Sequence, residues 1–534
     1  MAPKKVAIVG GGCSGLAAFW ALRNTDHEAH IYDSANRLGG ITHLAQYEKN
    51  GNQVNVDVGL VCFNPLTSPN LYAFLRELRV PLHDVPFSLA SSRDGGLFEW
   101  SSGSVLSLVS RNLFRLDLWR LLFDIVKFNY FAPDLLREEE KMAERMSHGR
   151  REATESRDDQ QTPMNIGTYL KKEGYSHAFR DHYIIPIISV LWSVHDPIHA
   201  LEFPITMLLR SMANGGLLRC FLFWPKWVTA AGMENIFDEA IQNTIPAERL
   251  HLNMKIDFIK VCREEGYLAL YTDKGEEEHF DHFIIATSAE EALRMISADA
   301  TDDEVQALGR HSTIRTIAIL HSDRSFMPKR PRTWGTLNHI SLSSLDSHQD
   351  DSTSQFSISY HINPLQNLPE RRFGPIFITL NPITPPHPLC VQGIWEYSRS
   401  TLTNRARTSQ HLLLPKIQNT RGISYCGPWT GCGGYEDAVR SGLMVATEHL
   451  GARLPFEIVE DPEGVVRGRM PVLTKRKRVV RLFVRVLLLV LLVMGVVRRV
   501  LLYFYVRWRG GRETRREAAA VAAKGKGKGK VKGG

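Results

Sequence analysis

The 534-residue chain lacks the cysteine patterns that mark disulfide-rich or metal-binding proteins. Its seven cysteines are an odd number without a repeating spacing, and no C-x-x-C pair occurs. This pattern indicates free thiols in a reducing compartment and argues against a zinc site or a redox dithiol. No metal ligand is therefore expected. The sequence also shows no serine–histidine–aspartate set and no paired carboxylates, so the catalytic residues stay unassigned.

The main part of the chain also lacks an excess of positive charge. Residues 475–534 contain 18 Lys and Arg and 2 Glu, a net charge of +16, whereas the whole chain carries +8. Residues 1–474 therefore carry a net charge of −8. The basic character belongs to a C-terminal tail on an acidic body, and no nucleic-acid partner is expected.

Long uninterrupted hydrophobic runs are missing as well. Only four apolar residues, Val6 to Val9, precede the first glycines, so no signal peptide is expected there. The longest apolar run, residues 486–497, has 12 residues and is too short to span about 30 Å of hydrocarbon. Extended to Val506 it has 21 residues, but Arg498 and Arg499 then lie near its middle. Fifteen Leu, Val and Phe at about −0.5 kcal/mol each, against two Arg at about +3 kcal/mol each, leave the insertion free energy near zero.

The tail nevertheless has the composition of a membrane-associated segment. Snorkelling of the central arginines favours a spanning helix, whereas an arginine stripe favours a helix lying in the interface of an anionic membrane. The stripe consists of Arg478, Arg481, Arg485, Arg499 and Arg507, within about 40° of one line, although Leu489, Leu492 and Val496 share it. A run packed on the body would require an unusually cationic buried helix. We expect residues 479–508 to be a membrane-associated helix with the body in the cytosol, and residues 509–534 to be a disordered basic tail that attracts anionic lipid.

What the sequence does contain is a glycine-rich turn near its start. Val6-Ala7-Ile8-Val9 is typical of a buried strand, and Gly10-Gly11-Gly12-Cys13-Ser14-Gly15 follows it. In a G-x-G-x-x-G turn, Gly10 makes the tight bend, Gly12 lets the backbone approach a pyrophosphate, and Gly15 lets the next helix pack closely. A second predicted strand, residues 29–32, precedes Asp33, which lies 18 residues after Gly15 and can bind ribose hydroxyls. This order predicts a dinucleotide site rather than a glycine loop without a ligand.

Two further segments carry glycines where a ligand would approach. Arg37-Leu38-Gly39-Gly40 follows Asp33, and its arginine can pair with a phosphate. Residues 422–442 have the pattern of strand, glycine loop and helix. No acid of the first type follows them, so they do not predict a second dinucleotide fold.

The remaining periodicities predict the elements between these segments. We expect helices over 70–80, 105–130 and 166–218, strands of a small sheet over 88–100, and strands over 250–261, 267–272 and 282–288. We also expect a charged, solvated helix that frays into a disordered insertion over 137–162, and an exposed loop at 341–354. The helical region 166–218 and the Trp224-Pro225-Lys226-Trp227 segment after it fit either an apolar pocket or plain core.

Together these segments resemble the two-domain FAD oxidoreductases of the flavin amine oxidase and phytoene desaturase superfamily. The resemblance rests on the GGGCSG turn, the RLGG loop, the ATS strand end at 286–288 and the YCGPWTGCGGYEDAVRSG segment at 425–442, and covers residues 4–452. More narrowly, VDVGLVCFNPLTSPNL, YSHAFRDHYIIPIISVLWS and the C-terminal segment are similar to predicted NAD/FAD-binding proteins related to the N-terminal domain of plant cyclopropane fatty acid synthases.

The resemblance implies one extended FAD site. The cofactor-binding residues it implies are Gly10, Gly12, Gly15, Asp33, Arg37, Gly39, Gly40, Gly59, Gly427, Tyr435 and Glu436. The first glycine turn would hold the pyrophosphate and Asp33 the adenosine ribose. The RLGG loop would follow the pyrophosphate and ribityl chain, and Gly59 would lie near the isoalloxazine. Gly427 would approach the ribityl phosphate, and the helix starting near Glu436 would direct its N–H groups toward the flavin O2.

The chain departs from the superfamily at two places. Pro428-Trp429 stands where an acid commonly binds the ribityl hydroxyls. Residues 316–323 contain no lysine of the kind that holds a water near the flavin in amine oxidases, and His321 is the titratable residue near the end of that strand. A lone histidine there is more often structural than catalytic. Cys426 and Cys432 fit small buried thiols better than a covalent flavin link.

We therefore predict an α/β fold: a Rossmann-like FAD-binding domain of the glutathione-reductase-like, two-domain flavin amine oxidase architecture, with an inserted α+β substrate domain and a C-terminal hydrophobic helix. The predicted parts are FAD-binding segments 1–90, 225–300 and 410–455, substrate segments 91–224 and 301–409, a basic linker 456–478, the helix 479–508 and the tail 509–534. The predicted activity is hydride transfer from an apolar or amphiphilic small molecule, lipids included, to FAD. A flavin amine oxidase and a non-catalytic FAD-binding scaffold are the alternatives, and flavin reduction by a substrate separates enzyme from scaffold.

Overall fold

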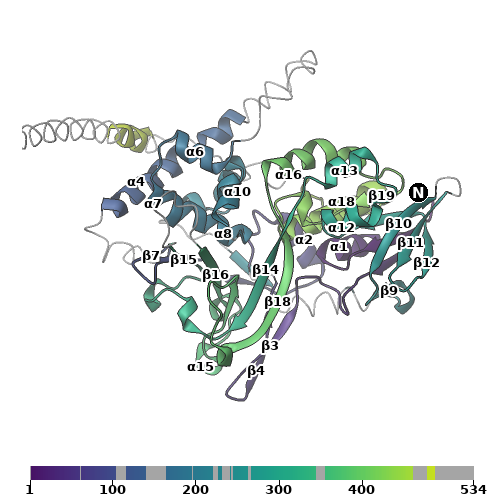
Figure 1. The fold of residues 1–534 in the computed structure, drawn as a ribbon, viewed down its shortest axis with the longest axis horizontal. Coiled ribbons are helices and arrows are strands. Elements are labelled where there is room, and N and C mark those ends of the chain that lie inside the picture. The colour runs from purple at the N-terminus through teal and green to yellow at the C-terminus, as the bar shows by residue number, and fades with distance from the viewer. Residues whose placement is uncertain are drawn as a thin grey trace, which may run out of the picture. The chain divides into compact units, whose positions relative to one another are not determined.

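The first predicted strand lies at the centre of a five-stranded parallel sheet in the computed structural model (Figure 1). The structure describes residues 2–59, 62–103, 116–139, 164–194, 196–219, 227–230, 241, 244–262, 266–343, 355–460 and 478–486. The sheet has the order β19-β13-β1-β2-β9, with bounds β1 Lys5–Val9, β2 Glu28–Tyr32, β9 Leu250–His251, β13 His282–Ile285 and β19 Ile423–Tyr425. Strands β1, β2, β13 and β19 are buried over most of their length on both faces, as in parallel sheets covered by helices.

Two helices pack closely against this sheet and against each other. α1 (Cys13–Leu22) follows β1, and all its residues are buried. α18 (Tyr435–Met444) follows β19 and packs against α1. A Cβ at Gly442 would lie 2.1 Å from the carbonyl oxygen of Ser14, so a side chain at this point would separate the two helices. The close contact brings the N-terminal ends of α1 and α18 to one region of the body.

The second large layer is a seven-stranded mixed sheet. Its order is β18-β14-β17-β16-β15-β6-β7, with bounds β6 Leu89–Arg93, β7 Phe98–Ser101, β14 Thr313–His321, β15 Leu337–Leu342, β16 Gln355–His361, β17 Phe377–Leu380 and β18 Val391–Ser400. The strands expected over 88–100 thus belong to a large sheet and not to a small one, because β6 pairs in parallel with β15. β15 also extends through Leu342, so the loop expected from Ser341 begins later, and residues 344–354 lie outside the described part.

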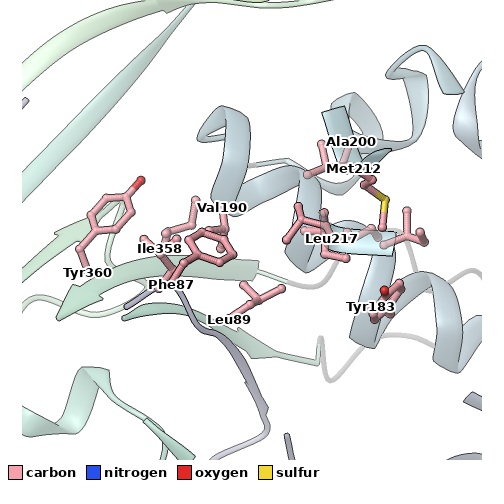
Figure 2. Packing of buried hydrophobic residues seen from close by; sticks show 14 of the residues in the cluster. Phe87, Leu89, Tyr183, Val190, Ala200, Met212, Leu217, Ile358 and Tyr360 are labelled. Atoms are coloured by element: carbon pink, nitrogen blue, oxygen red, sulfur yellow. The ribbon is translucent and has the colours of Figure 1, made fainter. Parts of the chain in front are cut away.

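Helices of the 116–219 region cover one end of the seven-stranded sheet (Figure 1). They are α4 Leu116–Phe131, α6 Ile166–Lys172, α7 His177–Phe179, η1 Arg180–Ile184, α8 Ile185–Trp192, α9 Pro197–Glu202, α10 Ile205–Asn214 and η2 Leu217–Arg219. Their apolar faces share one core with the sheet, in which Val190, Leu217, Ile358 and Tyr360 lie together (Figure 2). Residues 105–115 of the expected helix and residues 140–162 of the expected insertion lie outside the described residues.

Smaller elements complete the body. The strands are β3 Leu44–Lys49 paired with β4 Asn52–Asp57, β5 Leu82–Val85 paired with β8 Trp227–Ala230, and the sheet β10 Ile256–Cys262, β11 Tyr267–Thr272 and β12 Glu277–Phe280. The helices are α2 Pro69–Glu77, α12 Ala289–Ile296, α13 Asp302–Leu308, α14 Ile362–Leu365, α15 Glu370–Phe373, α16 Asn404–Thr408, η9 Ser409–Leu413, α17 Leu414–Ile417, η10 Pro428–Thr430 and η11 Val445–His449. The segments predicted from periodicity at 70–80, 267–272 and 282–288 therefore have the expected type.

The chain divides into two compact units, residues 1–470 and 471–534. The first contains both large sheets, and the boundaries predicted within it between cofactor and substrate segments stay a prediction. In the second, residues 478–486 are helical, and the rest of the expected membrane helix and basic tail lies outside the described residues. Over the part of the chain that the structure describes, no helix is long and apolar enough to cross a membrane.

Candidate active site

The glycine turn after β1 has the backbone geometry that its sequence requires. Gly10 has φ +108°, and a Cβ there would lie 2.9 Å from the carbonyl oxygen of Ala286 at the end of β13. A Cβ at Gly15 would lie 1.9 Å from the Gly10 carbonyl oxygen, so α1 can start this close to the turn only without a side chain at that position. Local sequence therefore places the N-terminus of α1 directly beyond the carboxyl end of β1.

Gly12 and Asp33 lie at the two sides of this turn. Gly12 is the N-cap residue of α1, lines a cavity, and has no atom within 4 Å of the position that a Cβ would take. Asp33 follows β2, and its Oδ2 accepts a hydrogen bond of 2.7 Å from the Gly11 amide. Its Oδ1 accepts one of 2.8 Å from the Ala35 amide. The arrangement leaves open backbone at Gly12 and a fixed carboxylate beside it, which suits a dinucleotide pyrophosphate and ribose.

The RLGG loop packs on the same turn. The Gly39 amide donates to the Gly11 carbonyl at 2.8 Å. The Arg37 guanidinium donates to the carbonyl oxygens of Leu38, Gly40 and Thr42 at 3.0–3.1 Å. Arg37 therefore holds the loop in shape through backbone carbonyls, and its expected pairing with a phosphate stays a prediction.

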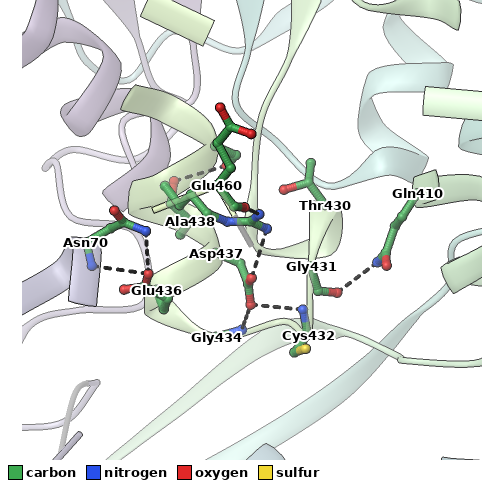
Figure 3. Close-up of polar contacts among 12 residues, drawn as sticks. Asn70, Gln410, Thr430, Gly431, Cys432, Gly434, Glu436, Asp437, Ala438 and Glu460 are labelled. Carbon is green, nitrogen blue, oxygen red and sulfur yellow. Dashed lines mark hydrogen bonds and ion pairs between the residues drawn. The ribbon is translucent and has the colours of Figure 1, made fainter. Parts of the chain in front are cut away.

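A second glycine loop leads into α18 and is closed by Asp437 (Figure 3). Asp437 accepts hydrogen bonds from the amides of Cys432 at 2.9 Å and Gly434 at 3.2 Å, and Arg440 lies 3.2 Å away. Burial raises the pKa of Asp437, whereas the charge of Arg440 and the two amide donors act to lower it. A Cβ at Gly431 would lie 1.9 Å from Asp437 Oδ1. The loop shape thus depends on a carboxylate three residues into the helix.

Glu436 ties this helix to α2 (Figure 3). Its carboxylate accepts hydrogen bonds from Asn70 Nδ2 at 2.6 Å, the Asn70 amide at 3.2 Å and the Leu71 amide at 2.8 Å. Burial raises the pKa of Glu436 to about 7, against the effect of these donors. Its side chain is therefore occupied at the start of α2, and what the residue offers a cofactor is its place in the first turn of α18.

The other predicted residues of this region lie beside the same helix end. The Tyr435 hydroxyl accepts a hydrogen bond from Thr42 Oγ1 at 3.2 Å, and a Cβ at Gly59 would lie 2.6 Å from that hydroxyl oxygen. Gly427 has φ +149°, and its amide donates to Ser441 Oγ at 2.9 Å. The structure thus brings Gly12, Gly39, Gly59 and Tyr435 to one cavity, and their roles toward a cofactor stay predictions.

That cavity has a volume of about 390 Å³, within the range of small-molecule sites. The first turns of α1 and α18 line one part of it. Residues of α8, η2, β15, β16 and β18 line the other part, and they are Val190, Leu191, Trp192, Leu217, Leu337, Tyr360, Ser398 and Arg399. The sequence had indicated the four residues of α8 and η2 only as part of the region 166–218, which fitted either an apolar pocket or plain core, and sequence reasoning missed the four residues of β15, β16 and β18. Ser193, just after α8, also lines the cavity and has the left-handed φ of +53°, which is uncommon for a residue other than glycine.

His321, Trp429 and Cys426, which the sequence left open as catalytic or cofactor-contacting residues, lie in buried or hydrogen-bonded positions. His321 Nε2 lies 2.7 Å from Thr379 Oγ1, its Nδ1 accepts from the Asp323 amide at 3.1 Å, and burial lowers its pKa to about 4. The Trp429 indole donates to the Thr287 carbonyl oxygen at 3.0 Å. Cys426 is fully buried, and burial raises the pKa of its thiol to about 12. Among the described residues, no cluster of His, Cys, Asp and Glu could hold a metal ion.

Comparison with known sequences finds similarity at the N-terminus. The family of NAD(P)-binding Rossmann-like domains matches residues 8–78. An L-amino-acid oxidase of Bothrops jararacussu is 33% identical over 75 residues, and one of Pseudechis australis is 31% identical over 75 residues. Each match covers 14% of this chain and 14% or 13% of the relative, so the chain spans about a seventh of the length of the curated relatives it matches.

Solved structures are similar over most of the body. Cyclohexylamine oxidase from Brevibacterium oxydans has a TM-score of 0.55 at 14% identity, covering 84% of this chain and 98% of that one. Reduced UDP-galactopyranose mutase has a TM-score of 0.55 at 15% identity, with coverages of 88% and 98%. A CLA-producing fatty acid isomerase from P. acnes has a TM-score of 0.53 at 14% identity, with coverages of 83% and 98%. At these identities the likeness shows the fold.

Proposed function

Because the chain has the fold of the flavin amine oxidase superfamily, we propose that it is an FAD-dependent oxidoreductase that takes a hydride from an apolar or amphiphilic small molecule. The observation that carries the proposal is the single cavity shared by the first turns of α1 and α18 and by an apolar wall. Helix N-termini attract anionic groups, and two of them here flank a space lined with glycine backbone. The apolar wall supplies a separate place for a substrate.

Different residues of the chain would bind the cofactor and the substrate in such a site. When bound, FAD supplies the hydride-accepting ring. The backbone at Gly12 and the first turn of α1 would hold its pyrophosphate, and Asp33 its ribose. The positive end of α18 would stabilise negative charge on the reduced ring. Leu191, Trp192 and Leu337 would exclude water and orient an apolar substrate.

The proposal for an apolar or amphiphilic substrate is supported by the wall and by one similar structure. The side chains of the wall are mostly aliphatic or aromatic, and Val190, Leu217 and Tyr360 among them belong to the core shown in Figure 2. The fatty acid isomerase among the similar structures is named for a lipid substrate, whereas the cyclohexylamine oxidase is named for an amine. The fold alone accommodates both, and the composition of the cavity favours the lipid-like class.

The first prediction is that the purified protein contains FAD and that the FAD is not covalently attached. Its absorption spectrum should show the flavin bands near one equivalent per chain, because both glycine loops form one site. Acid precipitation should leave the colour in the supernatant, since neither Cys426 nor Cys432 has a specific sequence signal for covalent attachment, and burial raises the pKa of the Cys426 thiol. Anaerobic addition of a substrate should bleach the flavin, which a non-catalytic scaffold would not show. A folded protein with no flavin, and no rise in melting temperature on adding FAD, would contradict the proposal.

We also propose that the tail holds the protein on a membrane with the body in the cytosol. The proposal is supported by the apolar residues 486–506 between basic clusters, each basic residue contributing about 1 kcal/mol near an anionic surface. Full-length protein should sediment with membranes, whereas a chain ending at Met470, the end of the compact body, should stay in solution. High salt or alkaline carbonate should release an interfacial helix, whereas only detergent should release a spanning one. Equal solubility of both chains in cells would show this proposal to be wrong.

A further inference from the structure

A single arginine lies in the wall of the cavity, on the last strand of the seven-stranded sheet. Along β18 the exposed and half-buried residues alternate, so Trp395, Tyr397 and Arg399 share the inward face. Arg399 lines both the main cavity and a small adjoining one, which Trp192 and Ser193 also line. Among the described residues that line the main cavity, it is the only cation.

Arg399 has no acidic partner among the described residues, in contrast to Arg421 and Arg440. Its Nε atom is buried without a hydrogen-bond partner, and no carboxylate forms an ion pair with it. Its guanidinium carbon lies 5.4 Å from the ring centre of Tyr397. Arg421 and Arg440, which are also largely buried, pair with Glu304 and Asp437. Because burial of a charged group is unfavourable unless it is paired, an unpaired guanidinium at a cavity points to a partner from outside the chain.

The surroundings of Arg399 indicate what kind of partner fits. Tyr360 and Tyr397 lie near it: burial raises the pKa of each phenol, and the arginine charge acts in the opposite direction. Tyr360 Oη lies 3.4 Å from Ser193 Oγ, which adds hydroxyl groups on the same side. The acids of the cavity, Glu436 and Asp437, are occupied by the donors described above. Apart from Ser398, the rest of this wall is apolar.

We propose that Arg399 binds the carboxylate of an amphiphilic substrate whose apolar part lies against Leu191, Trp192 and Leu337. The planar guanidinium can donate two parallel hydrogen bonds to a carboxylate, and the tyrosine hydroxyls can add a third donor. This inference rests on the proposed function, because it names the substrate class of the same cavity. With Arg399 in this role, the cavity binds acids more tightly than neutral molecules of the same length.

The test compares decanoate with decanamide, which has the same apolar chain and no charge. Dissociation constants are measured on the FAD-containing, full-length protein by perturbation of the flavin spectrum and by calorimetry. Decanoate should bind at least about tenfold more tightly than decanamide, as expected for charge-assisted hydrogen bonds in a desolvated site. Arg399→Met should remove this preference while decanamide affinity stays within about twofold. Arg399→Lys should keep part of the preference for decanoate, because the lysine ammonium carries the positive charge but cannot donate the two parallel hydrogen bonds of the guanidinium.

Arg405→Met is the matched control, because it makes the same change in charge on an exposed residue of α16 outside the cavity. It should keep the full preference for decanoate. Equal affinity of the unaltered protein for both probes, or an undiminished preference in Arg399→Met, would overturn the inference. Loss of FAD from Arg399→Met with the preference retained would assign the arginine to the cofactor instead and would also overturn it. If the protein holds no FAD, the proposed function fails, whereas calorimetry with the two probes still decides the role of Arg399.

Discussion

Gly12→Glu is expected to weaken FAD binding by at least about 100-fold, or roughly 2.8 kcal/mol. No atom lies within 4 Å of the position of a Cβ at Gly12, and the backbone there has φ −75°, so the substitution itself strains neither packing nor backbone. A glutamate would extend into the cavity at the N-terminus of α1, where the pyrophosphate is expected. Juxtaposed like charges cost several kcal/mol, and the side chain would also fill the space. Equilibrium dialysis with FAD measures the loss.

Two substitutions at the same position separate size from charge. Gly12→Ala adds one methyl group to open space and should weaken FAD binding only a few-fold, with an unchanged melting temperature of the cofactor-free protein. Gly12→Gln has the size of glutamate without its charge and should fall between the two. If all three variants bound FAD as tightly as the unaltered chain, the pyrophosphate could not lie at this turn. A loss of folding in the alanine variant would contradict the open space seen at Gly12.

The elements that the sequence predicted well are those fixed by contacts between neighbours in the chain. The bend at Gly10 and the start of α1 follow from φ and from close packing within six residues, and the strand–loop–helix of 422–442 follows in the same way. Their fold is confirmed by the similar structures. The role assigned to Arg37 depended on side-chain direction, which spacing does not determine. The structure directs its guanidinium toward backbone carbonyl oxygens.

The cavity wall depended on pairing between distant segments. β6 and β15 are adjacent in the sheet, although about 250 residues separate Ala90 from Asn338 in the chain, and no periodicity encodes that pairing. The alternation along β18 could have shown that Trp395, Tyr397 and Arg399 share a face, but not that this face borders a cavity. Tyr360 and Ser193 meet only because β16 and α8 pack together in the core. The sequence therefore indicated a possible apolar pocket only for the region 166–218, and the residues that the strands contribute to the wall appear only in the three-dimensional structure.

Arg421→Met is expected to destabilise the body by about 3–5 kcal/mol at pH 7, because it leaves a buried carboxylate without its counter-charge. Glu304 is fully buried in α13. Arg421, two residues before the start of β19, forms an ion pair with it. The Glu304 carboxylate also accepts a hydrogen bond of 2.9 Å from the Tyr425 hydroxyl and one of 2.8 Å from the Thr301 amide. Arg315→Met is the control: its pair with Glu396 is exposed, and its loss should cost less than about 1 kcal/mol. Denaturant unfolding measures both.

The pH dependence of this effect has a definite sign. Burial alone would raise the pKa of Glu304, but its hydrogen bonds, the one from Arg421 first, hold the pKa below the ordinary glutamate value. In the unaltered chain this group therefore stabilises the fold above that ordinary value, and the contribution is lost as the pH falls through the folded-state pKa. In Arg421→Met burial prevails and the pKa of Glu304 rises, so protonation relieves the unpaired charge and the stability difference should shrink between pH 7 and pH 4.

Adding Glu304→Gln to Arg421→Met should recover part of the stability at pH 7, because no charge is then buried. A difference that does not change with pH, or a double variant less stable than Arg421→Met, would mean that lost packing of the arginine side chain and not the buried charge causes the destabilisation.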